Sequence, residues 1–327
     1  MENQQNIRTF IDAVENKIAT IVPTCEPKEV YEPFKYLMSG GGKRLRPVLA
    51  LLACGAVSGE CMTSLDVAVA IEIIHNFTLA HDDVMDNSPL RRGRETIHTK
   101  WNVPAAILTG DLMIGYAYRL LNAYKEHKNY QLLVDTLSKS IIEVCEGQAY
   151  DIKSDTNPDV TLAEYFKTIG LKTSVLIQSS VRLGALVGDA TEQQLSELDK
   201  FAYNYGLAFQ IQDDLLDITA DQTKFGKPIG QDILEGKKTY LVLKAKELAT
   251  DDADKALINK YLHSNGLPAS YIQQMKNLFE KLNIFALAQE EIDILTIKAK
   301  LSLETFGNND YSKMLLDLIS SLNFRVK

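Results

Sequence analysis

The sequence predicts an all-α fold, built as one large bundle of antiparallel helices with a shared core. Apolar residues recur at three- and four-residue spacing along most of the 327 residues, which is the repeat of a helix with one buried face. Runs that alternate apolar and polar residues, the pattern of a strand, are scarce. No repeat of solenoid length and no long flexible linker is visible. We therefore expect residues 1–327 to form a single domain.

The individual helices are predicted from this spacing and from the turn residues between them. Ser39–Gly42, Asp155–Pro158, Gly226–Pro228 and Gly307–Asn309 lie where the periodic runs end. The segment Val67–Ala80 is largely apolar, so we expect it inside the bundle. In chain order the predicted helices span 4–21, 27–38, 43–58, 63–87, 103–126, 130–149, 161–188, 192–220, 236–249, 252–264, 269–282, 284–304 and about 310–322.

Composition and charge exclude several classes of protein. With 46% hydrophobic and 24% charged residues the chain is neither disordered nor fibrous, and a net charge of −8 argues against a nucleic-acid partner. Four cysteines without a C-x-x-C pair are expected to be reduced. The start of the chain lacks the features of a signal peptide, and the uncharged run Pro47–Gly59 is shorter than the ~20 residues of a membrane span. We expect a soluble, cytoplasmic protein.

Two clusters of aspartates are the most informative feature. The first cluster, Asp82, Asp83 and Asp86, ends an apolar helix, and on a helix its outer members lie one turn apart at ~5–6 Å. The second cluster repeats the pattern with Asp213, Asp214 and Asp217. A single D-D-x-x-D motif is more often a solvated helix end. Two such motifs in apolar surroundings indicate carboxylates that face an interior cavity and share hard divalent cations.

Basic residues near these clusters complete two predicted anion sites. Mg²⁺ usually takes one or two carboxylates together with phosphate oxygens, so the clusters imply a polyphosphate substrate. The segment Gly40–Pro47 runs from a glycine turn into a helix start and carries cationic side chains, without the spacing of a Walker loop. Arg91, Arg92 and Arg94 follow the first cluster, and Gly226–Thr239 follows the second. Each stretch alone is more often ordinary surface charge.

Taken together, these motifs resemble the trans-isoprenyl diphosphate synthases, also called polyprenyl synthetases. The likeness runs from about Gly41 to Thr239 and covers G-G-K-R-L-R-P, the first D-D-x-x-D with R-R-G, Lys172-Thr173, F-Q-x-x-D-D and G-K-P-x-G-x-D followed by G-K. The resemblance implies the isoprenoid synthase fold, a homodimer and three Mg²⁺ ions that bridge an allylic diphosphate to both clusters. It also implies a head-to-tail condensation of isopentenyl diphosphate with dimethylallyl, geranyl or farnesyl diphosphate.

The resemblance further implies roles for individual residues. His75 alone would more often be a helix histidine with ordinary partners, but it lies two turns before Asp82 and matches the family motif. The resemblance assigns the metal ligands or their support to Asp82, Asp83, Asp86, Asp213, Asp214 and Asp217. It assigns the ligands of isopentenyl diphosphate to Lys43, Arg46, His75 and Arg92. Around the allylic substrate it places Arg91, Lys172, Thr173, Gln210, Lys227 and Lys237.

Product length is expected to depend on the residues before the first cluster. Helical geometry places Thr78 ~40°, Ile74 ~80° and Phe77 ~140° from Asp82 around the axis, so Phe77 lies on a flank. Phe77 lies five residues before Asp82. An aromatic residue at this position is similar to the pattern of family members that make farnesyl or geranylgeranyl diphosphate, and we expect such a product. The alternatives are that Phe77 is plain core packing, or that a longer product forms, since the first cluster lacks the two-residue insertion of typical bacterial short-chain enzymes.

Three other readings of the sequence were weighed. A terpene cyclase would normally carry a different second metal motif, and a non-catalytic subunit of a heteromeric synthase tends to lose one cluster, whereas both are intact here. A structural bundle with metal-binding surfaces would show no diphosphate-dependent binding. The sequence leaves open the preferred allylic starter, the oligomeric state and the role of Lys255–Lys327.

Overall fold

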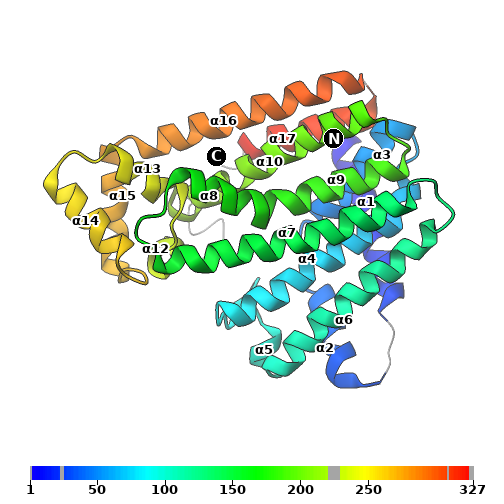
Figure 1. Cartoon of the computed structure of the whole chain (residues 1–327), viewed down its shortest axis with the longest axis horizontal. Coiled ribbons are helices and arrows are strands. Elements are labelled where there is room, and N and C mark those ends of the chain that lie inside the picture. Colours follow the sequence, from blue (N-terminus) through cyan, green and yellow to red (C-terminus); the bar gives the residue numbers. More distant parts are fainter. Residues whose placement is uncertain (1, 23–25, 220–228, 308, 324–327) are drawn as a thin grey trace. The chain divides into compact units, whose positions relative to one another are not determined.

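The computed structural model describes residues 2–22, 26–219, 229–307 and 309–323, and the described chain is almost entirely helical, which confirms the predicted fold class (Figure 1). Short elements connect the helices: the 3₁₀ turns η1 (Cys61–Ser64), η2 (Asn122–Tyr124), η4 (Ala269–Tyr271) and η5 (Glu304–Phe306), the π-turn η3 (Gly170–Ser174), and the strands β1 (Leu90–Arg91) and β2 (Arg94–Glu95). The helices are α1 (Glu2–Ile21), α2 (Lys28–Met38), α3 (Leu45–Ser58), α4 (Leu65–Met85), α5 (Ile97–Lys100), α6 (Val103–Leu121), α7 (Tyr130–Thr156), α8 (Leu162–Ile169), α9 (Val175–Val187), α10 (Glu192–Thr219), α12 (Gln231–Glu235), α13 (Tyr240–Leu248), α14 (Asp252–Leu262), α15 (Ile272–Lys281), α16 (Ile284–Leu303) and α17 (Asp310–Asn323).

Three local differences from the prediction concern the segments around the candidate site. The helix predicted over 161–188 is interrupted by the π-turn, which separates α8 from α9. The helix predicted over 236–249 begins only at Tyr240, because Gly236 adopts a left-handed conformation and ends the short helix α12 before it. The strands β1 and β2 form a small antiparallel hairpin that the sequence pattern did not reveal.

The chain folds as two compact units. The first unit comprises Met1–Ile141, Leu176–Asp199 and Thr305–Leu315, and the second comprises Ile142–Val175, Lys200–Glu304 and Leu316–Lys327. Three of their boundaries fall inside α7, α10 and α17, and the other two fall at the first residue of α9 and inside η5. Each aspartate cluster belongs to a different unit. That the whole chain is one domain stays a prediction.

Helix α4 is the centre of the first unit and packs along α6 and against α3 (Figure 1). Its residues Val67–Ile71 are fully buried, as the apolar run predicted. The stretch Cys61–Met85 is long and apolar enough to cross a bilayer by length and composition, but 67% of its most apolar window is buried within the protein. A buried core helix of a folded protein meets the same criteria of length and hydropathy.

The π-turn η3 lies in the second unit, packed against α7 and α10. Two glycines allow helix backbones to approach it closely: a Cβ on Gly147 of α7 would lie 2.5 Å from the Lys172 nitrogen, and one on Gly206 of α10 would lie 2.6 Å from Ser174 Oγ. Such distances are far below van der Waals contact, so neither position can carry a side chain unless the turn moves. The turn is thereby held between α7 and α10.

Candidate functional site

The first cluster is formed by the last turn of α4. The Asp86 nitrogen donates to the Asp82 carbonyl oxygen at 2.8 Å, so the helical path continues through both residues and their side chains are one turn apart. Asp83 is buried, 2% exposed, and accepts a hydrogen bond from Arg91 Nε at 2.7 Å. Burial raises the pKa of the Asp83 carboxyl, and the charge of Arg91 opposes that rise. Asp83 thus holds Arg91, while Asp82 is half-buried and Asp86 exposed.

The strands β1 and β2 present the arginines that follow the cluster. They are joined by Arg92 and Gly93, both at positive φ (+54° and +74°), which is the two-residue turn that matches strand twist. Arg92 Nη1 donates to the Gly41 carbonyl oxygen. Tyr36 Oη donates to the Glu95 carbonyl oxygen at 2.9 Å. The hairpin is therefore tied to the end of α2 and to the glycine turn.

The glycine turn leads into α3 and carries the next cationic side chains. Gly41, Gly42 and Arg44 all have positive φ, so the backbone reverses sharply before Arg46 in the first turn of α3. Lys43 is exposed and Arg46 half-buried. His75, on α4, has a pKa held well below its usual range, first by burial and then by the positive charges of Arg46 and Arg92. The imidazole is consequently neutral at pH 7 and lies in the positive field of these two arginines.

The three residues expected to govern product length are all buried in the first unit. Ile74 is fully buried, Phe77 is 6% exposed and Thr78 is 8% exposed. The Phe77 ring meets the His81 ring edge to face at 4.9 Å. His81 in turn lies 3.1 Å from the Ile107 carbonyl oxygen of α6 through its Nε2. The position of the Phe77 ring therefore depends on how α4 packs against α6.

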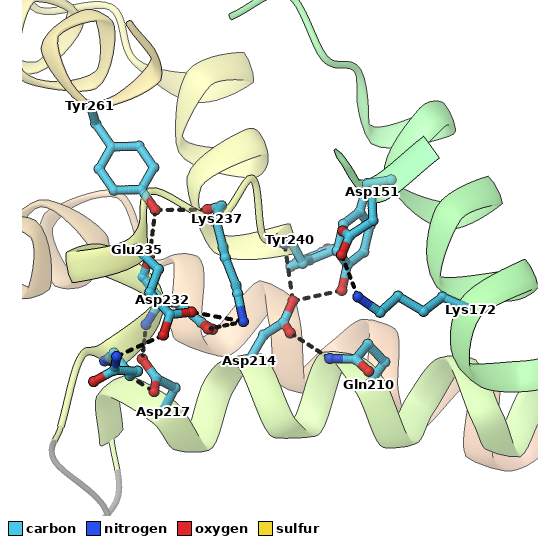
Figure 2. A network of polar contacts seen from close by, with 12 residues as sticks. Asp151, Lys172, Gln210, Asp214, Asp217, Asp232, Glu235, Lys237, Tyr240 and Tyr261 are labelled. Carbon is cyan, nitrogen blue, oxygen red and sulfur yellow. Dashed lines mark hydrogen bonds and ion pairs between the residues drawn. The ribbon is translucent and has the colours of Figure 1, made fainter. Parts of the chain in front are cut away.

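The second cluster lies on α10, and Figure 2 shows how its neighbours converge on it. Asp214 is buried and accepts hydrogen bonds from Tyr165 Oη at 2.6 Å, Gln210 Nε2 at 3.0 Å and the Tyr240 nitrogen at 3.3 Å. Burial raises the pKa of Asp214 to about 6, although the hydrogen bonds from Tyr165 and Gln210 favour the ionised form. Asp213, next to it, is exposed.

Asp217 connects the C-terminal end of α10 to the short helix α12 through hydrogen bonds. It accepts from the Gln231 nitrogen at 3.2 Å and from the Asp232 nitrogen at 3.1 Å. Burial raises the pKa of Asp217, and these backbone donors oppose the rise. The carboxylate therefore orders the segment that carries Asp232 and Lys237 (Figure 2).

Lys172 and Thr173 are placed by the π-turn. Lys172 Nζ is paired with Asp151 of α7. Thr173 Oγ1 donates to Gln210 Oε1 at 2.9 Å, and Gln210 passes the contact on to Asp214 through its amide nitrogen. Because the amide accepts at one end and donates at the other, its orientation is determined by its two partners.

Asp232 is a site residue that the sequence analysis did not single out. Burial and the charges of Asp214 and Asp217 raise its pKa well above the usual range. Lys237 Nζ lies 2.9 Å from Glu235 and 4.0 Å from Asp232. Burial works against the charge of Lys237, but these carboxylates outweigh it and raise its pKa. The signal for Asp232 was its place in the G-x-D part of the motif; Lys227, from the same motif, lies outside the described residues.

The donor set of both clusters fits Mg²⁺. Among the residues that the structure describes, no three His, Cys, Asp or Glu side chains converge on one point. An all-protein cage of the kind that binds Zn²⁺ or Ca²⁺ is therefore not formed by them. The exposed carboxylates of Asp86 and Asp213 suit Mg²⁺, which keeps waters and takes the rest of its ligands from phosphate oxygens.

The proteins that this chain resembles in sequence and fold are isoprenyl diphosphate synthases. The chain is 39% identical to a short chain isoprenyl diphosphate synthase of Methanocaldococcus jannaschii over 77% of this chain and 76% of the relative. It is 39% identical to a geranylgeranyl diphosphate synthase of Methanosarcina mazei over 74% and 77%. The structure of geranylgeranyl pyrophosphate synthetase from Pyrococcus horikoshii superimposes with a TM-score of 0.92, covering 98% of both chains at 33% identity.

A sequence model of the Polyprenyl synthetase family matches residues 27–280. The chain belongs to this family, as the motifs predicted.

Proposed function

We propose that this protein is a Mg²⁺-dependent trans-prenyltransferase that joins isopentenyl diphosphate head to tail with an allylic diphosphate and gives farnesyl or geranylgeranyl diphosphate. The observation that carries the proposal is the pair of carboxylate clusters, each of which ends beside cationic side chains held by hydrogen bonds and ion pairs. The family membership and the names of the relatives support the reaction type. Mg²⁺, the number of ions and the product are our proposals.

We infer that Asp82 and Asp86 in the first unit and Asp213 in the second hold the metal ions, with Asp83, Asp214 and Asp217 as further ligands or support. When bound, Mg²⁺ supplies the positive charge that helps a diphosphate to leave. The support role follows from the hydrogen bonds: Asp83 accepts from Arg91, and Asp214 accepts from three donors. Such contacts fix a carboxylate and leave fewer lone pairs for a cation.

The protein's own cations would stabilise the departing diphosphate. Arg91, Lys172 and Lys237 each have a carboxylate partner, so their positions are set before substrate arrives. Preorganised charge of this kind stabilises charge that develops in the transition state. As the allylic C–O bond breaks, the electron pair goes to the diphosphate, and Lys172 and Lys237 of the second unit would donate hydrogen bonds to its oxygens.

The allylic carbocation would be stabilised by dipoles of the π-turn. Because the Thr173 hydroxyl donates a hydrogen bond to Gln210, the lone pairs of Thr173 Oγ1 remain available toward a positive centre. The π-electrons of the isopentenyl double bond then form the new C–C bond at C1, and the departed diphosphate takes the proton that is lost. No nucleophilic side chain is required.

Isopentenyl diphosphate would bind at Lys43, Arg46, His75 and Arg92 in the first unit. The low pKa of His75 makes it a neutral hydrogen-bond donor among cations. Phe77 would limit the chain length of the product, with Thr78 and Ile74 beside it. Buried packing of the Phe77 ring against His81 supports a rigid wall.

We also propose a homodimer and a cytoplasmic location. Helix α6 exposes Val103, Ile107 and Leu108, the last with 54% of its surface accessible. An apolar helix face of this kind is typical of an interface with a second copy. Cys54, Cys61 and Cys145 form no disulfide among the described residues, and a reducing compartment is our proposal. Light scattering of the purified protein would test the dimer.

The reaction is tested by incubating the pure protein with Mg²⁺, radiolabelled isopentenyl diphosphate and each of dimethylallyl, geranyl and farnesyl diphosphate, followed by chromatography of the dephosphorylated products. A fifteen- or twenty-carbon alcohol is expected. Longer alcohols would support the proposed reaction but contradict the proposal that Phe77 limits the chain length of the product. No product in any mixture would overturn the proposal and favour a non-catalytic subunit.

A further inference from the structure

Arg44 is a buried charge in the middle of the glycine turn, and its role is not explained by substrate binding. Its side chain is 2% exposed, whereas Lys43 before it is exposed. The Arg44 backbone has φ +46° and ψ +37°, a left-handed conformation in which non-glycine residues are uncommon. Such a conformation persists only where the surroundings impose it. Something must therefore hold this arginine inside the first unit.

Three separate segments hold the guanidinium of Arg44. Nε donates to Glu15 of α1 at 2.7 Å, Nη1 donates to Glu72 of α4 at 2.8 Å, and Nη2 donates to the Met38 carbonyl oxygen at the end of α2 at 2.7 Å. Glu72 is 3% exposed and also accepts from Asn76 Nδ2 at 3.1 Å. Because a guanidinium is planar with donors at fixed angles, these contacts set both the position and the rotation of the turn.

The connected elements are those that carry the proposed ligands of isopentenyl diphosphate. Lys43 and Arg46 flank Arg44 in the chain, and His75 lies on α4 one turn from Glu72. A buried ion pair between turn and helix therefore fixes the cationic side chains of the turn against the histidine of the helix. Arg92 joins the same arrangement through the Gly41 carbonyl oxygen.

We propose that Arg44 and Glu72 are positioning residues for the isopentenyl diphosphate site: the buried pair holds the glycine turn against α4 so that Lys43, Arg46 and His75 meet one diphosphate group. The inference rests on the proposed function, since it names the substrate of that site. A pair with a purely structural role would instead lower stability and leave the relative affinity for the two substrates unchanged.

The test compares Arg44→Lys and Glu72→Gln with the wild-type protein. Both variants keep side-chain size close to that of the original residue. Arg44→Lys removes the planar donors that reach three acceptors, and Glu72→Gln keeps an acceptor oxygen but removes the negative charge. We expect KM and the calorimetric Kd for isopentenyl diphosphate to rise about tenfold, the effect of one lost charge-assisted contact. KM for geranyl diphosphate should change less than about twofold, within the scatter of unrelated substitutions.

Asp66→Asn supplies a matched control. Lys17 Nζ pairs with Asp66 Oδ1 at 2.7 Å, so this ion pair also joins α1 to α4 but does not touch the glycine turn. We expect Asp66→Asn to leave both substrate constants unchanged. Glu15→Gln serves if the buried variants fail to fold, because the Glu15 side chain is 40% exposed; it should raise the constants for isopentenyl diphosphate selectively.

The possible results separate the two proposals. Wild-type protein that neither binds nor turns over isopentenyl diphosphate overturns the proposed function, and this inference with it. An active wild type whose folded Arg44 or Glu72 variants show unchanged constants, or equal rises for both substrates, overturns only the positioning role. Selective rises that also occur in Asp66→Asn overturn it as well.

Discussion

Replacing Asp214 by Asn should raise the stability of the metal-free protein relative to the wild type as the pH rises through 6. The pKa of Asp214 is about 6 against an ordinary value of 3.8, so ionising it costs about 3 kcal/mol more in the folded chain than in the unfolded chain. Because the pKa is raised on folding, the stabilising contribution is complete at pH below the ordinary value. It is lost as pH rises through 6. Asn cannot ionise and is close to the protonated carboxyl in size; its carbonyl oxygen keeps one acceptor, and its NH2 group adds two donors.

The assay is urea unfolding of both proteins in chelator, at about pH 4 and about pH 7.5. The free energy of unfolding of Asp214→Asn minus that of the wild type should increase by up to about 3 kcal/mol between the two pH values. Asp251→Asn is a control with the opposite sign. Hydrogen bonds from the Ala253 and Asp254 nitrogens lower the pKa of Asp251, so its stabilising contribution is lost as pH falls. A difference for Asp214→Asn that does not change with pH would refute the argument.

The other predictions concern metal, product and packing. Asp82→Ala and Asp213→Ala should each reduce turnover by orders of magnitude while circular dichroism stays unchanged; turnover equal to wild type would sink the metal assignment. Chelator should abolish product formation and added Mg²⁺ should restore it, whereas full activity in chelator would exclude a metal requirement. Phe77→Ala should lengthen the product seen by chromatography, and an unchanged product would return this ring to plain core packing. Gly206→Ala should lower the free energy of unfolding by ~1–3 kcal/mol through overpacking, while Gly115→Ala, where a Cβ would meet no atom within 4 Å, should be neutral or slightly stabilising in the same urea titration.

The helices could be predicted from sequence because their apolar spacing is regular, and both aspartate clusters were visible because they interrupt such spacing. The π-turn at Gly170–Ser174 could not be predicted, because the apolar repeat continues through it and the glycines packed against it, Gly147 and Gly206, lie on other helices. The hairpin was missed for a similar reason. Its strands are two residues long, too short to show an alternation.

Within the candidate site, sequence motifs named the charged residues but not their partners. Nothing near Asp214 in the chain indicates that Tyr165 and Tyr240 donate to it, since both lie on other helices. Likewise the pairing of Arg44 with Glu72 joins residues 28 positions apart. Partner choice of this kind depends on tertiary packing, which local spacing does not encode.

The left-handed backbone conformation of Arg92 limits how far the stability of the hairpin turn can be raised while this side chain is kept. Asn and Gly adopt this conformation more readily than Arg, so Arg92→Asn or Arg92→Gly would relieve strain at the hairpin turn. Each would also remove the cation and its contact to the Gly41 carbonyl oxygen. If Arg92 binds isopentenyl diphosphate as proposed, selection for heat resistance alone would favour these replacements and selection for activity would oppose them.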